Sequence, residues 1–409
     1  MEIFRNTNFD FLGKKWPFII ASLVLTVAGI GSIVAKGGLR YGIDFRGGAL
    51  MTVKWATNPP EDKIRAALAK KITGEVTVQP FTDLSVKNEV AISTEITNEK
   101  ELNSNLRAMQ EVLEQTFGHP QSGKKDFNNA GTEEIVSGLR EPLQQSGAQL
   151  SDQQLRQLVA DILAFRDSPP RSGLLAGFDQ LSGVAGVNSG IINALKQQFY
   201  LSPFHVADRA LVGPKVGAEL RKKAVLATLY ALGGMLVYIA FRFEWIYGVA
   251  AVVAVFHDTI ITIGLFSLFN KEISLTVIAA LLTLVGYSMN DTIVIFDRIR
   301  ENLKILRREP LESLINKSIN QTLSRTIMTS GLTFLTVIAL FLFGGPVLHG
   351  FSFALVAGII VGTYSSVFIA SPIVLFWHNF VDSRRQSAPA PAPVVKSQPA
   401  RKSPTRAAK

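Results

Sequence analysis

The chain has 409 residues, of which 47% are hydrophobic and only 18% are charged, and its mean hydropathy is +0.25. Soluble domains carry about 25% charged residues, so this composition argues against an ordinary soluble protein and favours membrane-spanning segments. The absence of cysteine excludes disulfides and thiolate metal sites. The net charge of +10 comes without a nucleic-acid-binding motif, and the five histidines show no ligand spacing. We therefore predict no metal, no cofactor and no nucleic-acid partner.

Apolar runs of about 20 residues, long enough to cross a bilayer, recur along the chain. They predict six transmembrane helices, at 16–35, 224–241, 245–269, 273–296, 326–343 and 347–377. The first is longer than the apolar region of a signal peptide, so we interpret it as a retained anchor. Six crossings place both termini on the same side of the membrane.

Basic residues near the short loops indicate which side that is, because cytoplasmic loops are enriched in Lys and Arg. The segment between the fourth and fifth spans is strongly basic, and Lys14, Lys15 and Arg242 lie on the same side. The basic residues of the segment between the fourth and fifth spans are Arg298, Arg300, Lys304, Arg307, Arg308 and Lys317. We predict that 1–15 and the Pro/Ala-rich basic tail at 378–409 are cytoplasmic, with the tail disordered and solvated; contact with anionic lipid or ribosomal RNA is the alternative. Arg221, Lys222 and Lys223 lie on the opposite face, where long translocated segments escape the rule.

The region 36–223 then forms one large extracytoplasmic domain. Its pattern predicts a βαββαβ unit, the ferredoxin-like α+β arrangement. The expected strands are 49–55, 76–81, 89–94 and 206–212, and the expected helices are 60–71 and 99–117. The Gln-, Gly- and Ser-rich stretch at about 118–180 is interpreted as an insertion with one amphipathic helix near 152–165. A lid, a substrate-contacting arm and a passive loop remain open for it.

The motif YGIDFRGG at 41–48 follows the first span almost immediately. Gly47 and Gly48 allow unusual backbone angles, and no Lys-Ser/Thr follows them as in a phosphate-binding loop. We interpret the motif, with Gly42 and Asp44, as a hinge between membrane and domain. Asp44 and Arg46 are either partners of each other or surface charges.

Three ionisable residues stand in or beside apolar spans: Asp258, Asp291 and Arg325. A charge at mid-bilayer costs about 2.5–3.5 kcal/mol on insertion scales, so a partner is expected. Asp291 and Arg325 can pair if the fourth and fifth helices form an antiparallel hairpin. The pair is then either a structural ion pair or a proton carrier, in which burial and the Arg act on the Asp pKa in opposite directions.

Other polar and small residues support this region. Asp258 follows His257 directly, so we expect the two on different helix faces and no catalytic dyad. A hydrogen-bonded structural role and a supporting role in proton coupling both remain open for Asp258. Tyr287 and Asn290, with Ser288, provide a polar face for water or a proton path near Asp291. Small residues predict close helix packing, and they are Gly233, Gly234, Gly358 and Gly362.

Long motifs in fixed order resemble the SecF branch of the bacterial SecD/SecF protein-export family, within the resistance-nodulation-division superfamily. They include YGIDFRGG (41–48), RFEW (242–245), VFHD (255–258), AALLTLVGYSMNDTIVIFDRIREN (279–302), SINQTLSRTIMTS (318–330) and GFSFALVAGIIVGTYSSVFIASP (350–372). The resemblance covers the first span, the early domain and everything from about 204 to 377. The insertion and the tail depart from the family pattern.

The resemblance implies a multi-pass protein of the bacterial inner membrane that works with SecD and the SecYEG channel. It implies that the proton-motive force promotes late preprotein translocation after SecA has hydrolysed ATP, with YajC and YidC as further candidate partners. Asp291 and Arg325 match the family's proton-passage residues. An exporter of small molecules from the same superfamily, and a passive scaffold with a structural Asp–Arg pair, are the competing hypotheses. No nucleophile elbow, P-loop or metal motif indicates an enzyme.

Overall fold

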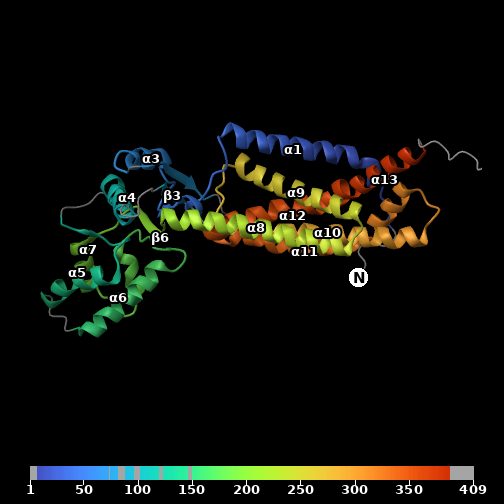
Figure 1. Ribbon diagram of the computed structural model, residues 1–409. Coiled ribbons are helices and arrows are strands. Elements are labelled where there is room, and N and C mark those ends of the chain that lie inside the picture. Colours follow the sequence, from blue (N-terminus) through green and yellow to red (C-terminus); the bar gives the residue numbers. More distant parts are fainter. Residues whose placement is uncertain are drawn as a thin grey trace, which may run out of the picture.

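The computed structural model describes residues 7–72, 74–81, 88–95, 102–118, 123–145 and 150–386. It consists of a long helical bundle with an extramembrane domain at one end, and the N-terminus and α13 (Ser371–Gln386) lie at the other end (Figure 1). Residues 1–6 and 387–409 lie outside the described part, so the predicted disorder of the tail is not addressed beyond 386. The prediction was wrong for 378–386, because the last spanning helix continues past its apolar run and ends only at Gln386.

Within the described ranges, six helices are long and apolar enough to span a membrane, as predicted. They are α1 (Lys15–Ala35), α8 (Pro214–Arg242), α9 (Trp245–Leu268), α10 (Leu275–Ile305), α11 (Leu311–Phe343), and α12 (Gly345–Ser365), which continues through a π turn (Ser366–Ala370) into α13 (Ser371–Gln386). The expected basic loop between the fourth and fifth spans is largely helical, because α10 and α11 extend past their apolar runs. Only 306–310 connects them.

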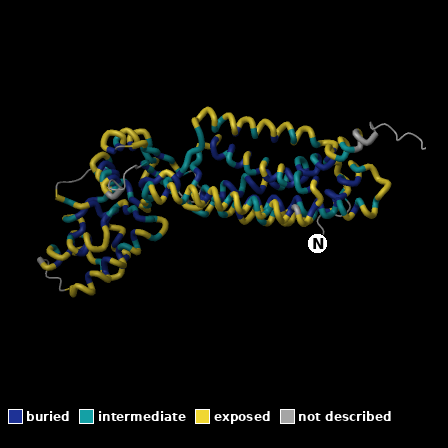
Figure 2. The backbone as a smooth tube through the Cα atoms, in the orientation of Figure 1, coloured by how far each residue is buried: buried dark blue, intermediate teal, exposed yellow. Residues whose placement is uncertain are grey.

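Burial divides the bundle into inner and outer helices (Figure 2). Half of the spanning window is buried in α9 and in α10, and 61% in the helix from Val347 to Val381. The corresponding shares are 11% for α1 and α8 and 17% for α11. The outer helices therefore present large apolar surfaces outward, which suits contact with lipid or with another membrane subunit.

Close packing of the inner helices depends on some of the predicted small residues. A Cβ at Gly358 would lie 2.5 Å from the Leu284 side chain of α10, and one at Gly362 would lie 3.1 Å from Ser288 Cβ. The prediction was wrong for Gly233 and Gly234, which have nothing within 4 Å of an added Cβ. These two lie on outer helix α8.

The extramembrane domain contains the predicted ferredoxin-like sheet, in the order β2-β3-β1-β6 with all neighbours antiparallel. Its elements are β1 (Gly48–Trp55), α3 (Glu61–Ala69), β2 (Val76–Pro80), β3 (Glu89–Glu95), α4 (Leu102–Phe117) and β6 (Phe204–Val212). Alternate residues of central strand β1, Ala49 to Trp55, are buried in one core with α3 and α4. This alternation is what a strand with one face on two helices requires.

The region after α4 folds as a helical unit with its own core. It contains β4 (Lys125–Asp126), α5 (Thr132–Gln145), α6 (Asp152–Asp167), α7 (Ser189–Gln198) and β5 (Phe199–Tyr200). Helix α6 lies where the one amphipathic helix is expected. The unit continues beyond the expected end of the insertion at 180, because Ile191, Leu195 and Phe199 bury their side chains in the same core. We call residues 123–203 the insertion.

Candidate intramembrane site and its link to the domain

Asp291 lies in the middle of α10 and is 3% exposed. Its Oδ2 accepts a hydrogen bond of 2.9 Å from the Ser330 hydroxyl of α11. The short connection at 306–310 makes α10 and α11 an antiparallel hairpin (Figure 1). This hairpin brings Asp291 and Ser330 together. A carboxylate in the bundle is thus held by a neutral donor from the next helix.

Arg325 is exposed on α11, and no ion pair joins it to Asp291 among the residues that the structure describes. The buried face of α11 is instead occupied by hydroxyl residues at a spacing of four, which leaves Arg325 on the outer side. These are Ser318, Thr322, Thr326 and Ser330, each at most 7% exposed. On α10, Asn290 is also exposed, whereas Tyr287 is half-buried one turn before Asp291.

The hydroxyl residues of α11 form a polar stripe that sequence reasoning missed. Asn302 near the end of α10 donates 2.8 Å to Ser318 Oγ, at the start of the stripe, and Ser330 contacts Asp291 at its other end. In between, the buried Thr326 hydroxyl has no hydrogen-bond partner within the described ranges. The spacing of four in SINQTLSRTIMTS was the available signal. The stripe offers polar groups from Asp291 to the end of the bundle opposite the domain.

Asp258 on α9, also in the bundle, is a fully buried carboxylate. Its Oδ2 accepts hydrogen bonds from Ser288 of α10 and from Ser365 of α12, the latter at 2.8 Å. Its Oδ1 lies 2.8 Å from Nδ1 of His257. The expectation that His257 and Asp258 point apart was therefore wrong, because both side chains bend toward each other at the helix surface. Asp258 joins the three inner helices.

The motif at 41–48 makes several hydrogen bonds to the bundle. Its residues Ile43–Arg46 form the short helix α2. Gly42 donates to the Ile273 carbonyl at 3.0 Å, and Ile273 donates to the Arg40 carbonyl at 2.7 Å. Asp44 accepts a hydrogen bond of 2.8 Å from the Leu275 amide, at the start of α10. The motif is therefore docked on the loop between α9 and α10.

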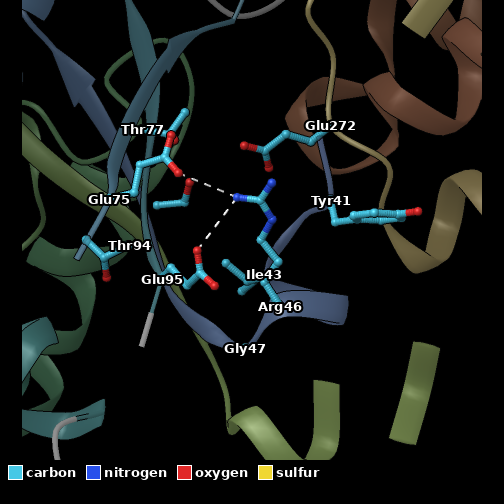
Figure 3. A pocket seen from close by; sticks show the side chains of 10 residues that line it. Tyr41, Ile43, Arg46, Gly47, Glu75, Thr77, Thr94, Glu95 and Glu272 are labelled. Atoms are coloured by element: carbon cyan, nitrogen blue, oxygen red, sulfur yellow. Dashed lines mark ion pairs between the residues drawn. The ribbon is translucent and has the colours of Figure 1, made fainter. Parts of the chain in front are cut away.

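Asp44 and Arg46 are not partners of each other. Arg46 reaches across to the sheet, with its guanidinium 3.7 Å from Glu75 and 3.8 Å from Glu95, and Glu272 approaches from the bundle side (Figure 3). These residues line a cavity of about 30 Å³, room for roughly one water molecule. Burial raises the pKa of Glu272, while the Arg40 and Arg46 guanidinium groups oppose this rise. The cluster connects the two parts of the molecule.

The backbone conformation and close packing at positions 47 and 48 require glycine. Gly47 has φ 78° and ψ 154°, and a Cβ there would lie 2.7 Å from Pro214 Cα. Gly48 has φ 145°, and its added Cβ would lie 2.1 Å from the Thr94 carbonyl oxygen of β3. Both positions therefore need φ values and close approaches that side chains forbid.

The bundle and its site define a class: a polytopic membrane protein with six spanning helices, an intramembrane carboxylate and a ferredoxin-like extramembrane domain. Comparison with known proteins makes the class specific. Residues 193–380 match the family described as protein export membrane protein SecD/SecF, C-terminal, and residues 32–54 match the SecD/SecF GG motif. The chain belongs to the SecD/SecF family.

Individual relatives agree with this assignment. Protein translocase subunit SecF of Koribacter versatilis is 50% identical over 96% of this chain and 98% of its own length. Protein translocase subunit SecDF of Thermus thermophilus is 55% identical over 41% of this chain and 23% of its own. The crystal structure of SecDF from Thermus thermophilus, a translocon-associated membrane protein, superimposes with a TM-score of 0.60 at 32% identity. That match covers 91% of this chain and 39% of the SecDF chain.

Proposed function

We propose that this chain is the SecF-type subunit of a bacterial protein translocase, in which protonation of Asp291 couples the proton-motive force to late preprotein export. The observation that carries the proposal is the position of Asp291: buried at mid-helix, with a neutral hydroxyl as its hydrogen-bond donor. A charged carboxylate without a cation is costly inside a bilayer. Loss of its proton therefore favours an arrangement that brings Arg325 or water to it, and regain of the proton favours the arrangement described above.

The polar stripe of α11 supplies a route for the proton. Thr326 and Ser330 lie one turn apart on the buried face of α11, and Ser318 continues the row toward Asn302. We propose that water joins these hydroxyl groups transiently, so that protons leave Asp291 toward the end of the bundle opposite the domain. That end carries the basic residues typical of a cytoplasmic surface. Both termini are then cytoplasmic, the helices span the bacterial inner membrane, and the domain is periplasmic.

A partner subunit follows from the exposed side of the same helices. Asn290 and Arg325 face outward from membrane-spanning segments, where contact with lipid is costly. We propose that a SecD-type six-helix unit covers this face, since a SecDF protein combines both names in one chain. The other proposed partners are SecYEG, SecA, unfolded preproteins and membrane lipid, with YajC and YidC as further associates. The chain acts in this assembly as an accessory subunit and not as an enzyme.

The test follows preprotein release from inverted membrane vesicles that contain this chain, a SecD partner and SecYEG. SecA starts translocation and is then removed, and release is measured with and without a proton gradient. Asp291→Asn keeps the shape and the acceptor for Ser330 but cannot titrate. Asp297→Asn is the matched control, because Asp297 lies on the same helix, is half-exposed and pairs with Arg242 at 2.9 Å.

The gradient should accelerate release with the unchanged chain and with Asp297→Asn, and should have no effect with Asp291→Asn. Co-purification with the partners should be equal in all three. If Asp291→Asn retains the gradient effect while the complex assembles, Asp291 is structural and the proposal fails.

A further inference from the structure

We propose that Gly42–Gly48, here called the arm, transmits movement of α10 to the extramembrane domain, with Asp44 as the positioning residue. This inference rests on the proposed function, because it assumes that α10 moves when Asp291 changes its protonation state. It assigns the physical link between the intramembrane carboxylate and the domain that would act on the preprotein. One end of the arm contacts the bundle, and the other end contacts the sheet.

The grip on the bundle is made by Asp44 and Phe45. The Asp44 carboxylate accepts the amide of Leu275, the first residue of α10, while Ser274 caps Val277 at 3.3 Å. A carboxylate at a helix N-terminus is stabilised by the exposed amides and by the helix dipole. Phe45 is 4% exposed and is buried in the core at this end of the bundle. Members of that core from α10 are Val277, Ala280, Leu281 and Leu284.

The helix itself carries the movement over the required distance. α10 is continuous from Leu275 to Ile305, with no proline or π turn inside it. Asp291 lies 16 residues after Leu275, which is about 24 Å along the axis at 1.5 Å per residue. A shift or tilt of α10 at Asp291 therefore moves Leu275 and the Asp44 carboxylate that caps it.

The grip on the sheet is made by the other end of the arm. Gly47 and Gly48 lead directly into β1, the strand that pairs with both β3 and β6. Arg46 adds charge contacts to Glu75, beside β2, and to Glu95, at the end of β3. Because Gly48 packs directly against the Thr94 carbonyl, the end of the arm is fixed in position relative to β3. A displacement of the arm therefore rotates the sheet as a unit.

A second connection makes rotation the expected response. Gly213 alone joins β6 to α8. Helix α8 also packs closely against the arm, because a Cβ added at Gly217 would lie only 2.9 Å from the Gly47 amide nitrogen. The domain is thus joined covalently to α8 and, through the arm, to α1, and it contacts the start of α10 through Asp44. Gln79 of β2 adds a hydrogen bond of 3.4 Å to Glu272 in the loop before α10. Relative movement of α8 and α10 therefore tilts the domain about its connection to α8, and the arm transmits the displacement.

The experiment uses the full complex and exploits the absence of cysteine in this chain. Spin labels at Lys63→Cys on exposed α3 and Val347→Cys at the domain end of α12 report the distance between domain and bundle. Distances are measured with Asp291 and with Asp291→Asn, in chains that carry Asp44, Asp44→Asn or Asp44→Ala. Gradient-driven release is measured for the Asp44 variants in the same vesicles. Asp62→Ala, on exposed α3, is the control carboxylate.

Asp291→Asn should shift the distance distribution in the chain with Asp44. Asp44→Ala should abolish that shift and reduce the gradient effect on release by about fivefold or more, without changing gradient-independent release. Asp44→Asn retains an acceptor for Leu275 and should restore much of both responses, which a loss of charge alone would not. Asp62→Ala should behave as the unchanged chain.

A persistent Asp291-dependent shift in Asp44→Ala overturns the inference, even if the proposed function holds. If Asp44→Ala does not assemble, Arg46→Gln decides in its place, since it releases the sheet end while leaving the α10 cap intact. Loss of the gradient effect in the unchanged chain, by contrast, refutes the proposed function itself and the arm's role with it.

Discussion

Replacing Gly47 with alanine is the most direct test of how tightly the arm is docked. At φ 78° and ψ 154°, Gly47 occupies a region of backbone conformation that is essentially restricted to glycine. Gly42, at the start of the same arm, has φ −69° and ψ 174°, which any residue adopts. The nearest atom to an added Cβ at Gly42 is 3.6 Å away, an ordinary contact. The two glycines form a matched pair.

The magnitude follows from two contributions. Backbone strain at such a position costs about 1–3 kcal/mol, and the new Cβ would lie 2.7 Å from Pro214 Cα, well inside the normal separation of carbon atoms. Together we expect Gly47→Ala to destabilise the docked arm by about 2–4 kcal/mol. This corresponds to roughly 30- to 700-fold more of the detached state. Gly42→Ala should change it by less than about threefold.

Hydrogen exchange of the purified chain measures this population directly, because local opening exposes the amides of Gly42 and Leu275. Exchange of both amides should accelerate in Gly47→Ala, with little change in Gly42→Ala or in the amides of α6. Equal exchange in the two variants would refute the assignment of Gly47 to a strained, close-packed position.

Three further predictions concern other parts of the molecule. Arg166→Leu removes the donor of two buried backbone carbonyls at 2.8 and 2.9 Å, so it should destabilise the insertion by about 2–5 kcal/mol and speed its proteolysis, whereas exposed Arg156→Leu should not. Burial lowers the pKa of His205, so stability should be full above about pH 6.5 and decline as the pH falls toward the lowered folded-state pKa. Thermal melts should show this slope, and His205→Gln should flatten it. Thr326→Val should weaken gradient-driven release without loss of assembly, and exposed Thr329→Val should leave it unchanged.

Much of the architecture was predictable because hydrophobic length and alternation are local properties of the sequence. The six spans follow from apolar runs, and the βαββαβ order follows from period-two strands such as Ala49–Trp55. The helical unit beyond 180 was not anticipated, because its core joins short apolar segments from several helices. Only the packed arrangement reveals that Phe127 and Phe199 share one cluster, with rings 5.7 Å apart.

The residue types at the site were predictable from the sequence, whereas the contacts between these residues were not. A carboxylate within an apolar run identifies Asp291, since burial of charge is unusual enough to be read directly. Its contact with Ser330 depends on the rotation of α11, which places Thr326 and Ser330 inward and Arg325 outward. Likewise, Asp44 contacts an amide 231 residues later in the chain, and no local pattern encodes that pairing.

The insertion has a consequence for the order in which the domain is made. Central strand β1 is synthesised roughly 150 residues before β6, so one of its edges stays open until β6 emerges. A disordered linker of roughly 85 residues between α4 and β6 would oppose that late pairing. Because the insertion folds locally and the parallel β4–β5 pair brings Asp126 beside Tyr200, it shortens the effective loop to about a dozen residues. The saving in closure entropy is about 2 kcal/mol, so a long segment of chain helps the last strand to find the first.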